Sequence, residues 1–448
     1  MKSKKFNILV NSKISSFKKT INIDSDKSLS IRGFLIGSIS NGVSILKNVL
    51  ESEDVKSTIT ACKKLGVKII KVKSGHYKIF GNGIGSLSIK KNSKLNFGNS
   101  GTLARLIIGI LSSTPNIHIS IKGDHSLNKR NMRELFELMS KFGSIFIPKK
   151  KLTFPIKFIS SKYPVGINYS AGESAQLKSA AILAGLNCYG KTIINEKKIS
   201  RDHTENLLIK NSKAIKITKK NGIKKITVLG KESLKSFSLN VSGDPSSAAF
   251  FTALTLLNKN SSIKIKNVGL NKTRIGFYEI LKNKGANIKF TNLKKENNEV
   301  KGDIIVKSCT LKPLNTSPKM YPSTTDEYLL LFLIACFQNG VSTFKGIAGL
   351  ANKESSRALE MKKILSQIGI KSILMKDQIK IFGKKEINTK NKKIIVNNLG
   401  DHRIAMCAFI LAILTNTQTF IKNFDTVFTS SPSFLKIMKK LGAKFEIR

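Results

Sequence analysis

Three strongly polar residues, Asp401, His402 and Arg403, stand directly before an apolar stretch, residues 404–414, in the phrase GDHRIAMCAFILAIL. An acidic residue is ordinary at that place, because an aspartate at a helix start offsets the positive end of the helix dipole. An arginine in the first turn is harder to explain, since its charge faces the same positive end. We therefore expect an anion beside Arg403.

Phrases of this kind, a polar or glycine-containing start followed by an apolar helix, recur six times. Their first residues, 71 to 82 positions apart, are Asp26, Gly98, Gly172, Gly243, Thr325 and Gly400. A helix start presents unpaired backbone N–H groups and partial positive charge, which favour carboxylate and phosphate groups. If several such starts emerge on one side of each domain, the cleft between the domains attracts anions.

A second phrase, a short amphipathic helix that ends near glycine and leads into an alternating strand, recurs on the same period. Its turn residues, 71 to 84 positions apart, are Gly66, Gly143, Ala214, Gly285, Gly369 and Gly442. Glycine suits a helix end because it adopts the left-handed conformation at little cost. Two independent phrases on one period predict six repeated units.

Strand-like stretches such as IHISIKG and TQTFIKNF lie between these phrases. Each unit therefore combines two helices with several strands, a mixed α+β element that cannot bury its faces alone. A chain of 448 residues also exceeds the size of one hydrophobic core. We expect two similar domains of three units each, with a boundary near Val241.

The composition indicates a globular protein rather than a membrane or secreted one. Its longest unbroken apolar run, residues 404–414, is about half of what a bilayer requires. The apolar residues after the basic start MKSKK are too few for a signal peptide, so we expect a soluble, cytoplasmic protein. Five widely spaced cysteines without a CxxC motif predict reduced structural thiols and no metal site.

The net charge of +51 would ordinarily indicate nucleic-acid binding, because basic surfaces gain affinity by releasing counterions. Here the lysines run through every segment and are not interleaved with aromatic residues, as a base-stacking surface requires. We interpret the charge as a compositional bias of the whole chain and do not expect a nucleic-acid partner. An anionic substrate is compatible with either interpretation.

Nine motifs, in order from one end of the chain to the other, resemble those of the enolpyruvyl transferase family, in its branch of 5-enolpyruvylshikimate-3-phosphate synthases. The motifs are DKSLSIR (26–32), GNSGTLAR (98–105), GDHSLNKR (123–130), SAQLKSAAILAGL (174–186), SRDHTE (200–205), GDPSSAAFF (243–251), DEY (326–328), NKESSR (352–357) and GDHRIAM (400–406). This resemblance implies the inside-out α/β barrel of the enolpyruvyl transferase fold.

The resemblance also implies a domain arrangement. Residues 24–240 would form a first domain, mainly on the shikimate 3-phosphate side. Residues 1–23 and 241–448 would form a second, carrying the acid/base pair and the phosphoenolpyruvate arginines. The active site would lie in the cleft between the domains, which close on substrate and thereby exclude water. We expect a monomer.

The implied reaction transfers the enolpyruvyl group of phosphoenolpyruvate to the 5-hydroxyl of shikimate 3-phosphate, without a metal or an organic cofactor. The resemblance places on phosphoenolpyruvate Lys27, Gly101, Arg130, Gln176, Arg357 and Arg403. It places on shikimate 3-phosphate Lys27, Ser28, Arg32, Ser174, Ala175, Gln176, Arg201, Asp326 and Lys353. Guanidinium groups suit both ligands, because they pair in bidentate fashion with carboxylate and phosphate.

Proton transfer is needed at the hydroxyl and at the methylene carbon. The resemblance makes Asp326 the base for the hydroxyl and Glu354 the group that delivers a proton to the methylene carbon and then removes one. Lys27 would neutralise or protonate the departing phosphate. Gly101 would let the backbone approach the ligand where a side chain would intrude.

Several positions depart from the family pattern. Asn131 and Leu329 stand where proline is usual, Ser356 where aspartate is frequent, and Ser431 where phenylalanine is usual. They leave the acid/base pair and the arginines intact, and leave catalytic efficiency open. The family is a glyphosate target, but Gly101 and the SAQ motif with Ala175 indicate opposite sensitivities.

Three alternatives stay open at this point. UDP-N-acetylglucosamine enolpyruvyl transferases share the fold, but they typically carry a cysteine, or an aspartate in its place, on a loop of the first domain. The corresponding residues here, 112–130, include no cysteine. A nucleic-acid-binding relative built from similar repeats, or a catalytically silent homologue, are the other two.

Overall fold

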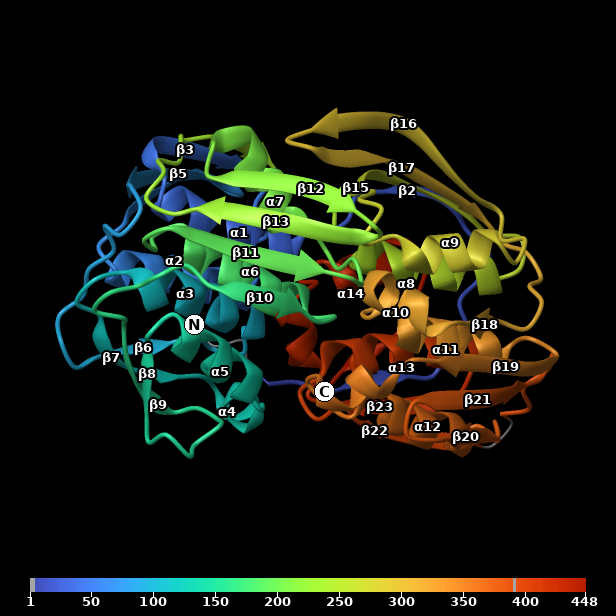
Figure 1. Ribbon diagram of the computed structural model, residues 1–448. Coiled ribbons are helices and arrows are strands. Elements are labelled where there is room, and N and C mark those ends of the chain that lie inside the picture. The colour runs from blue at the N-terminus through green and yellow to red at the C-terminus, as the bar shows by residue number, and fades with distance from the viewer. Residues whose placement is uncertain (1–4, 390–391) are drawn as a thin grey trace. The chain divides into compact units, whose positions relative to one another are not determined.

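The computed structural model describes residues 5–389 and 392–448 (Figure 1). They group into two compact units. The 25–242 unit consists of Ser25–Ser242 together with Lys295–Glu299, and the 243–448 unit consists of the residues up to Asp24, Gly243–Lys294 and Val300–Arg448. Each unit has its own core of buried aliphatic and aromatic side chains.

The 25–242 unit contains three four-stranded sheets with one topology. In each sheet the first strand pairs in parallel with the second, and the third is antiparallel to the second. In order across each sheet, the strands are β14 (Ser238–Asn240), β3 (Asn41–Lys47), β5 (His76–Asn82) and β4 (Lys68–Lys73); β6 (Ser93–Asn96), β7 (His118–Lys122), β9 (Ile156–Ile159) and β8 (Ile145–Ile147); and β10 (Asn168–Ala171), β11 (Lys191–Glu196), β13 (Ile223–Leu229) and β12 (Ile215–Lys220).

The 243–448 unit repeats this topology in three further sheets. Their strands, again in order across each sheet from the parallel pair, are β2 (Lys18–Ile21), β15 (Ser262–Gly269), β17 (Glu299–Lys307) and β16 (Ile288–Glu296); β18 (Asn315–Thr316), β19 (Gly340–Lys345), β21 (Gln378–Gly383) and β20 (Ser372–Leu374); and β22 (Lys393–Asn397), β23 (Gln418–Lys422), β1 (Ile8–Val10) and β24 (Glu446–Ile447). Six sheets of matching topology confirm the six repeated units. The N-terminal strands β1 and β2 belong to this unit, and β2 lies beside β15 in Figure 1.

The six apolar phrases each form a helix that is buried over most of its length. These helices are α1 (Lys27–Ser38), α3 (Gly101–Ser113), α6 (Ala175–Gly185), α8 (Pro245–Leu257), α11 (Tyr328–Cys336) and α13 (His402–Thr415). Five of them begin at an aspartate or serine whose side chain accepts a backbone N–H of the first turn, which satisfies one of the otherwise unpaired donors. Close packing also explains Gly109 of α3, because a Cβ there would lie 2.6 Å from the carbonyl oxygen of Ala180 in α6.

Further helices complete the repeats. They are α2 (Glu53–Lys64), α4 (His125–Lys129), α5 (Arg133–Lys141), α7 (His203–Asn211), α9 (Gly276–Lys282), α10 (Tyr321–Thr324), α12 (Arg357–Gln367) and α14 (Phe434–Lys440), with 3₁₀ turns η1 (Pro318–Met320), η2 (Ala348–Asn352) and η3 (Phe424–Thr429). None of the helices in the described ranges is long and apolar enough to cross a membrane.

The turns that follow six of these helices agree with the second repeated phrase at five places. Gly66, Gly143, Gly285, Gly369 and Gly442 all have positive φ, between 79° and 98°. The sixth turn residue, Ala214, is different, because α7 is followed by the extended residue Ser212 rather than by a left-handed one. A glycine is therefore not needed there, and alanine fits.

Candidate active site

In the 243–448 unit, Arg357 holds three carboxylates. It is the first residue of α12 and its side chain is almost completely buried. Its Nε lies 2.9 Å from Asp401 Oδ2, its Nη2 2.6 Å from Glu354 Oε2, and its Nη1 3.4 Å from Asp326 Oδ1. The side chains of Glu354 and Asp326 are 22% and 20% exposed, so they reach solvent while Asp401 does not.

The charge of Arg357 is secured by these partners. Burial alone lowers the pKa of a guanidinium, but attraction to Asp401, Glu354 and Asp326 outweighs it and raises the pKa of Arg357 well above its ordinary value. The arginine thus stays protonated at any ordinary pH. Its guanidinium group therefore holds both Asp326, the predicted base, and Glu354, the predicted acid.

Arg403 contacts Asp326, whereas the anion expected beside it, phosphoenolpyruvate, stays a prediction. Arg403 lies in the first turn of α13, where Asp401 caps the helix by accepting the N–H of Arg403 at 3.0 Å. The Nη1 of Arg403 donates to the backbone carbonyl of Asp326 at 3.0 Å, and its Nη2 lies 3.7 Å from Asp326 Oδ2. Two arginines therefore flank Asp326. The remaining predicted residue of this unit, Lys353, is half-buried in the segment between η2 and α12.

In the 25–242 unit, Lys27 and Arg32 both lie on α1. Lys27 is its first residue, and its Nζ is 3.0 Å from Asp54 Oδ2. Arg32 is buried, and its guanidinium donates to the hydroxyls of Ser28, Thr204 and Ser179. Ser28, a predicted ligand, is thus fixed by Arg32, another predicted ligand.

The start of α3 brings Gly101 next to two arginines. A Cβ at Gly101 would lie 2.8 Å from Arg105 Nη1 and 3.0 Å from Arg130 Nη1. Arg130 also donates to Asn99 Oδ1. A side chain at this position would thus displace one or both guanidinium groups, while the expected approach of the ligand to Gly101 stays a prediction.

The start of α6 carries Ser174, Ala175 and Gln176. Ser174 is the N-cap and accepts the N–H of Leu177 at 3.4 Å. The side-chain nitrogen of Gln176 donates to the hydroxyl of Thr102 in α3 at 2.9 Å, so the starts of α6 and α3 are tied together. Arg201, the last predicted ligand of this unit, is half-buried in residues 197–202, which connect β11 to α7.

The sequence interpretation missed a buried cluster of charged residues around Lys178 of α6. Lys178, in α6, has a fully buried side chain and lies 2.8 Å from both Glu196 Oε1 and Glu205 Oε1. A signal was present in the sequence: a lysine inside the otherwise apolar helix of SAQLKSAAILAGL must have a partner, because an unpaired buried charge is costly.

The positions that depart from the family pattern have local roles. Asn131 Oδ1 accepts the N–H of Arg133 at 2.8 Å, at the start of α5. Leu329 is buried in α11, and Ser431 donates to Asp24 Oδ2 at 3.0 Å. Ser356 occupies the N-cap position of α12 without a side-chain capping bond. Asn131 and Ser431 thus hold loops by hydrogen bonds.

Two buried cysteines of the 25–242 unit are poor nucleophiles. Burial raises the pKa of the Cys62 thiol to about 11 and that of Cys188 to about 12, so neither is a thiolate at neutral pH. The five cysteines form no disulfide, and within residues 5–389 and 392–448 no cluster of His, Cys, Asp or Glu could hold a metal ion.

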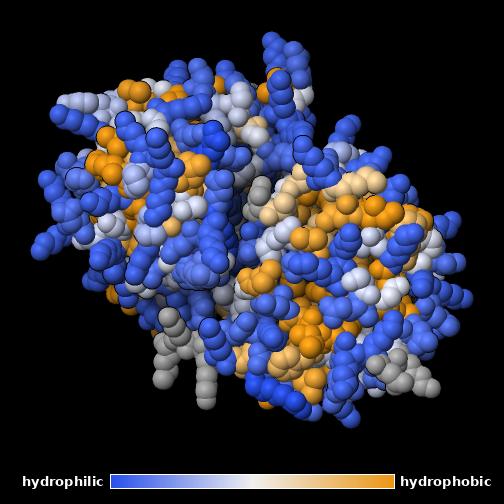
Figure 2. Space-filling view, turned by 90° about the horizontal axis from the view of Figure 1, so that it is seen from below, coloured by the Kyte–Doolittle hydropathy of each residue, from blue (hydrophilic) through white to orange (hydrophobic). Residues whose placement is uncertain are grey.

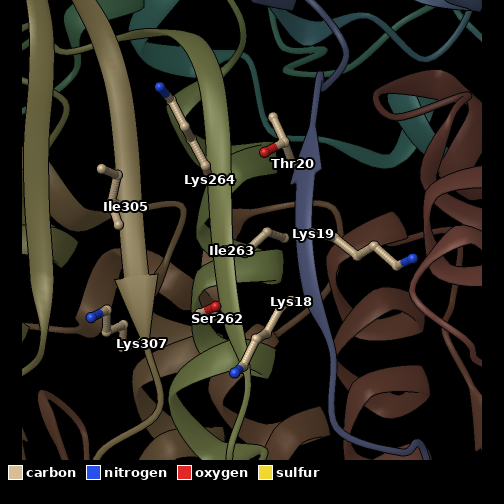
Figure 3. A pocket seen from close by; sticks show the side chains of 8 residues that line it. All are labelled: Lys18, Lys19, Thr20, Ser262, Ile263, Lys264, Ile305 and Lys307. Carbon is tan, nitrogen blue, oxygen red and sulfur yellow. The ribbon is translucent and has the colours of Figure 1, made fainter.

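A surface hollow of about 280 Å³ lies elsewhere, on the sheet of β2, β15 and β17 (Figure 3). It is lined by Lys18, Lys19, Thr20, Ser262, Ile263, Lys264, Ile305 and Lys307. None of these is a predicted site residue, and Lys264 is paired with Asp303 at 3.1 Å. On the face shown in Figure 2, hydrophobic patches lie among hydrophilic side chains rather than apart from them.

The comparisons with known proteins identify the family. The EPSP synthase (3-phosphoshikimate 1-carboxyvinyltransferase) family matches residues 11–438. The chain belongs to the EPSP synthase family. It is 34% identical over 443 residues to a 3-phosphoshikimate 1-carboxyvinyltransferase of Zymomonas mobilis, covering 98% of this chain and 97% of the relative. It is 34% identical over 433 residues to that of Bacillus subtilis, covering 96% and 99%.

Solved structures agree with this assignment. An EPSP synthase from Acinetobacter baumannii superposes with a TM-score of 0.84 at 32% identity, covering 99% of this chain and all of that one. The enolpyruvyl transferase NikO from Streptomyces tendae reaches a TM-score of 0.75 at 12% identity, which shows a shared fold alone. The resemblance drawn from nine motifs is confirmed, and so is the mixed helix-and-strand fold in two sheet-rich units.

Proposed function

We propose that this member of the EPSP synthase family transfers the 1-carboxyvinyl group of phosphoenolpyruvate to the 5-hydroxyl of shikimate 3-phosphate and releases phosphate. The observation that carries the proposal is the cluster around Arg357. It holds two partly exposed carboxylates, Asp326 and Glu354, next to a second cation, Arg403. Carboxylates near fixed arginines are what proton transfer on a doubly anionic substrate requires.

The proposed steps use these residues as follows. Asp326 accepts the proton of the 5-hydroxyl as the oxygen adds to C2 of phosphoenolpyruvate, and Glu354 protonates the methylene carbon. Phosphate then leaves while Glu354 takes a proton back from the new methyl group, which restores the double bond. Arg357 and Arg403 neutralise the negative charge of phosphoenolpyruvate, and Lys27 serves the departing phosphate.

Shikimate 3-phosphate is assigned to the 25–242 unit. Ser28, Arg32, Ser174, Gln176 and Arg201 would hold it, at the starts of α1 and α6 and in residues 197–202. Helix starts attract phosphate through their free N–H groups. The proposal therefore assigns the acceptor to the 25–242 unit and the acid/base pair to the 243–448 unit. We further propose that the enzyme acts as a monomer in the cytoplasm.

The test is phosphate release from purified protein supplied with phosphoenolpyruvate and shikimate 3-phosphate. UDP-N-acetylglucosamine replaces the acceptor in a parallel reaction. The variant Asp326→Ala should abolish release, whereas Glu137→Gln, which removes an exposed carboxylate paired with Arg133, should not. Release that occurs only with shikimate 3-phosphate supports the proposal.

Two results would redirect the assignment. Release with the nucleotide sugar instead would move the protein to the other branch of the fold. No release with either acceptor, from protein that is folded by circular dichroism, would overturn the enzymatic proposal. Nucleic-acid binding would then be measured against salt concentration, since many phosphate contacts give a steep decline.

A further inference from the structure

Lys178 is a buried cation that the proposed chemistry does not use. It stands in the first turns of α6, two residues after Gln176, and its side chain has no exposed surface. Its Nζ is 2.8 Å from Glu196 Oε1 and 2.8 Å from Glu205 Oε1, and it donates to the backbone carbonyl of Ser200 at 3.4 Å. Three contacts from one ammonium group match its three donors.

The cluster is balanced in charge. Lys224 of β13 adds a second ammonium, 3.2 Å from Glu205 Oε1 and 3.8 Å from Glu196 Oε2. Burial alone would lower the pKa of Lys178, but attraction to Glu205 and Glu196 raises it above its ordinary value. Burial would likewise raise the pKa of Glu205, but Lys178 and Lys224 lower it. Lys178 and Glu205 are therefore both charged at neutral pH.

The two glutamates stand at the two ends of one short segment. Glu196 is the last residue of β11, Glu205 is in α7, and residues 197–202 between the strand and the helix include Arg201. Glu196 Oε1 also accepts the N–H of Ser200 at 2.7 Å and its hydroxyl at 2.6 Å. Ser200 directly precedes Arg201, so these two hydrogen bonds fix the backbone next to Arg201.

A second network ties the same segment to the neighbouring helices. Arg32 of α1 donates to the hydroxyl of Thr204 at 2.8 Å, and Thr204 donates to Ser179 of α6 at 2.8 Å. Ser179 follows Lys178 in the chain. Helices α1 and α7 are thus both joined to α6 through its consecutive residues Lys178 and Ser179.

We propose that Lys178 is a positioning residue that sets the place of Arg201 relative to Ser174 and Gln176. This inference rests on the proposed function, in which all three residues hold shikimate 3-phosphate. Lys178 touches no substrate. It fixes both ends of residues 197–202 to the first turns of the helix that carries the other two ligands.

Stability alone is a weak explanation for this cluster. Buried ion pairs can often be replaced by well-packed apolar residues at little cost in stability, because desolvation offsets their attraction. Orientation is a different matter, since a ligand group displaced by about 1 Å can lose about 100-fold in rate or affinity. The structural and positioning roles therefore predict different outcomes.

The experiment uses charge-balanced double variants, so that no carboxylate is left buried without a cation. In Lys178→Met/Glu196→Gln the pair of Glu205 and Lys224 remains, and in Lys178→Met/Glu205→Gln the pair of Glu196 and Lys224 remains. The dissociation constant for shikimate 3-phosphate is measured by titration calorimetry, because the chain has no tryptophan to report binding by fluorescence. The KM for phosphoenolpyruvate is measured at saturating shikimate 3-phosphate.

We expect the dissociation constant to rise between about 10-fold and about 100-fold in whichever double variant folds, while the KM for phosphoenolpyruvate changes less than about twofold. The matched control is Lys198→Met. It removes an exposed ion pair, Lys198 to Glu173 at 2.7 Å, that joins the same segment to the residues just before α6. The control should bind shikimate 3-phosphate as the wild type does.

The outcomes separate this inference from the proposed function. Folded double variants that bind shikimate 3-phosphate as tightly as the wild type overturn the positioning role and leave the proposed function intact. Equal losses for both substrates also overturn it, because they indicate a general structural effect. A wild type that does not bind shikimate 3-phosphate overturns both.

Discussion

Replacing Arg357 should separate its contribution to stability from its hold on the two reactive carboxylates. In Arg357→Met, Asp401 keeps its hydrogen bonds from Ser355 and from the N–H of Arg403 but loses its guanidinium. Breaking a buried pair in this way costs about 3–5 kcal/mol of unfolding free energy. In Arg357→Lys the ammonium can stay with Asp401, so the loss is limited to the two contacts with Glu354 and Asp326.

Those two contacts involve carboxylates that are about one-fifth exposed. At about 0.5–1 kcal/mol for each partly solvated pair, Arg357→Lys should lose about 1–2 kcal/mol. The double variant Arg357→Met/Asp401→Asn should recover part of the loss, because no buried charge remains unpaired. Unfolding in urea, followed by circular dichroism, measures the free energy of unfolding of all three variants.

The control is Arg133→Lys, at an exposed pair with Glu137, and it should leave the urea midpoint unchanged. Two results would refute the reasoning: a methionine variant as stable as the lysine variant, or a double variant that is no more stable than the methionine variant. Either would mean that Asp401 does not depend on the guanidinium.

Three further predictions concern activity and pH. Asp326→Asn should lower kcat by about 10²–10⁴ while leaving the affinity for shikimate 3-phosphate within a few fold of the wild type. Steady-state phosphate release measures kcat and calorimetry measures the affinity. An unchanged kcat would exclude Asp326 as the base. Gly101→Ala should raise the KM for phosphoenolpyruvate, because its Cβ would lie 3.0 Å from Arg130 Nη1. The KM is measured in the same phosphate-release assay, and an unchanged value would contradict the assignment of Arg130 to phosphoenolpyruvate. Burial alone would raise the pKa of Glu51, but Lys71 and further hydrogen bonds lower it from 4.5 to about 2. The ionised carboxylate therefore stabilises the folded protein fully above pH 4.5, and this contribution disappears as the pH falls through 2. Glu51→Gln should therefore be less stable than the wild type in urea at pH 6 and approach it near pH 2, and a pH-independent difference would argue against the ion pair.

The repeated fold could be predicted because its signals are local. A capping residue before an apolar helix and a glycine after an amphipathic one are each determined within a few positions. Ala214 shows the limit of such signals: the phrase recurs there, but its chain continues from an extended Ser212 and needs no glycine. Local sequence indicated the repeat without specifying the conformation of each turn.

The candidate site divides in the same way. An anion beside Arg403 could be expected from one helix start, but the contact of Arg403 with Asp326 could not, because the two residues are 77 positions apart in the chain. The ion cluster of Lys178 could not be predicted from the sequence, because its partners lie at the end of one strand, in a second helix and in a second strand, which meet only in the folded unit. A charge in an apolar helix indicates that partners exist without identifying them.

The strands nearest the N-terminus have to wait for the rest of the chain. Ile8 of β1 pairs with Ile421 and Ile447, and the backbones of Asn7 and Arg448 exchange two hydrogen bonds. During synthesis on the ribosome, β1 therefore emerges first and finds its partners last, whereas residues 25–242 contain every strand of three sheets. A circularly permuted chain that begins at Ser25, with a short linker joining the paired ends, would present β1 close to the time at which its partners β23 and β24 appear.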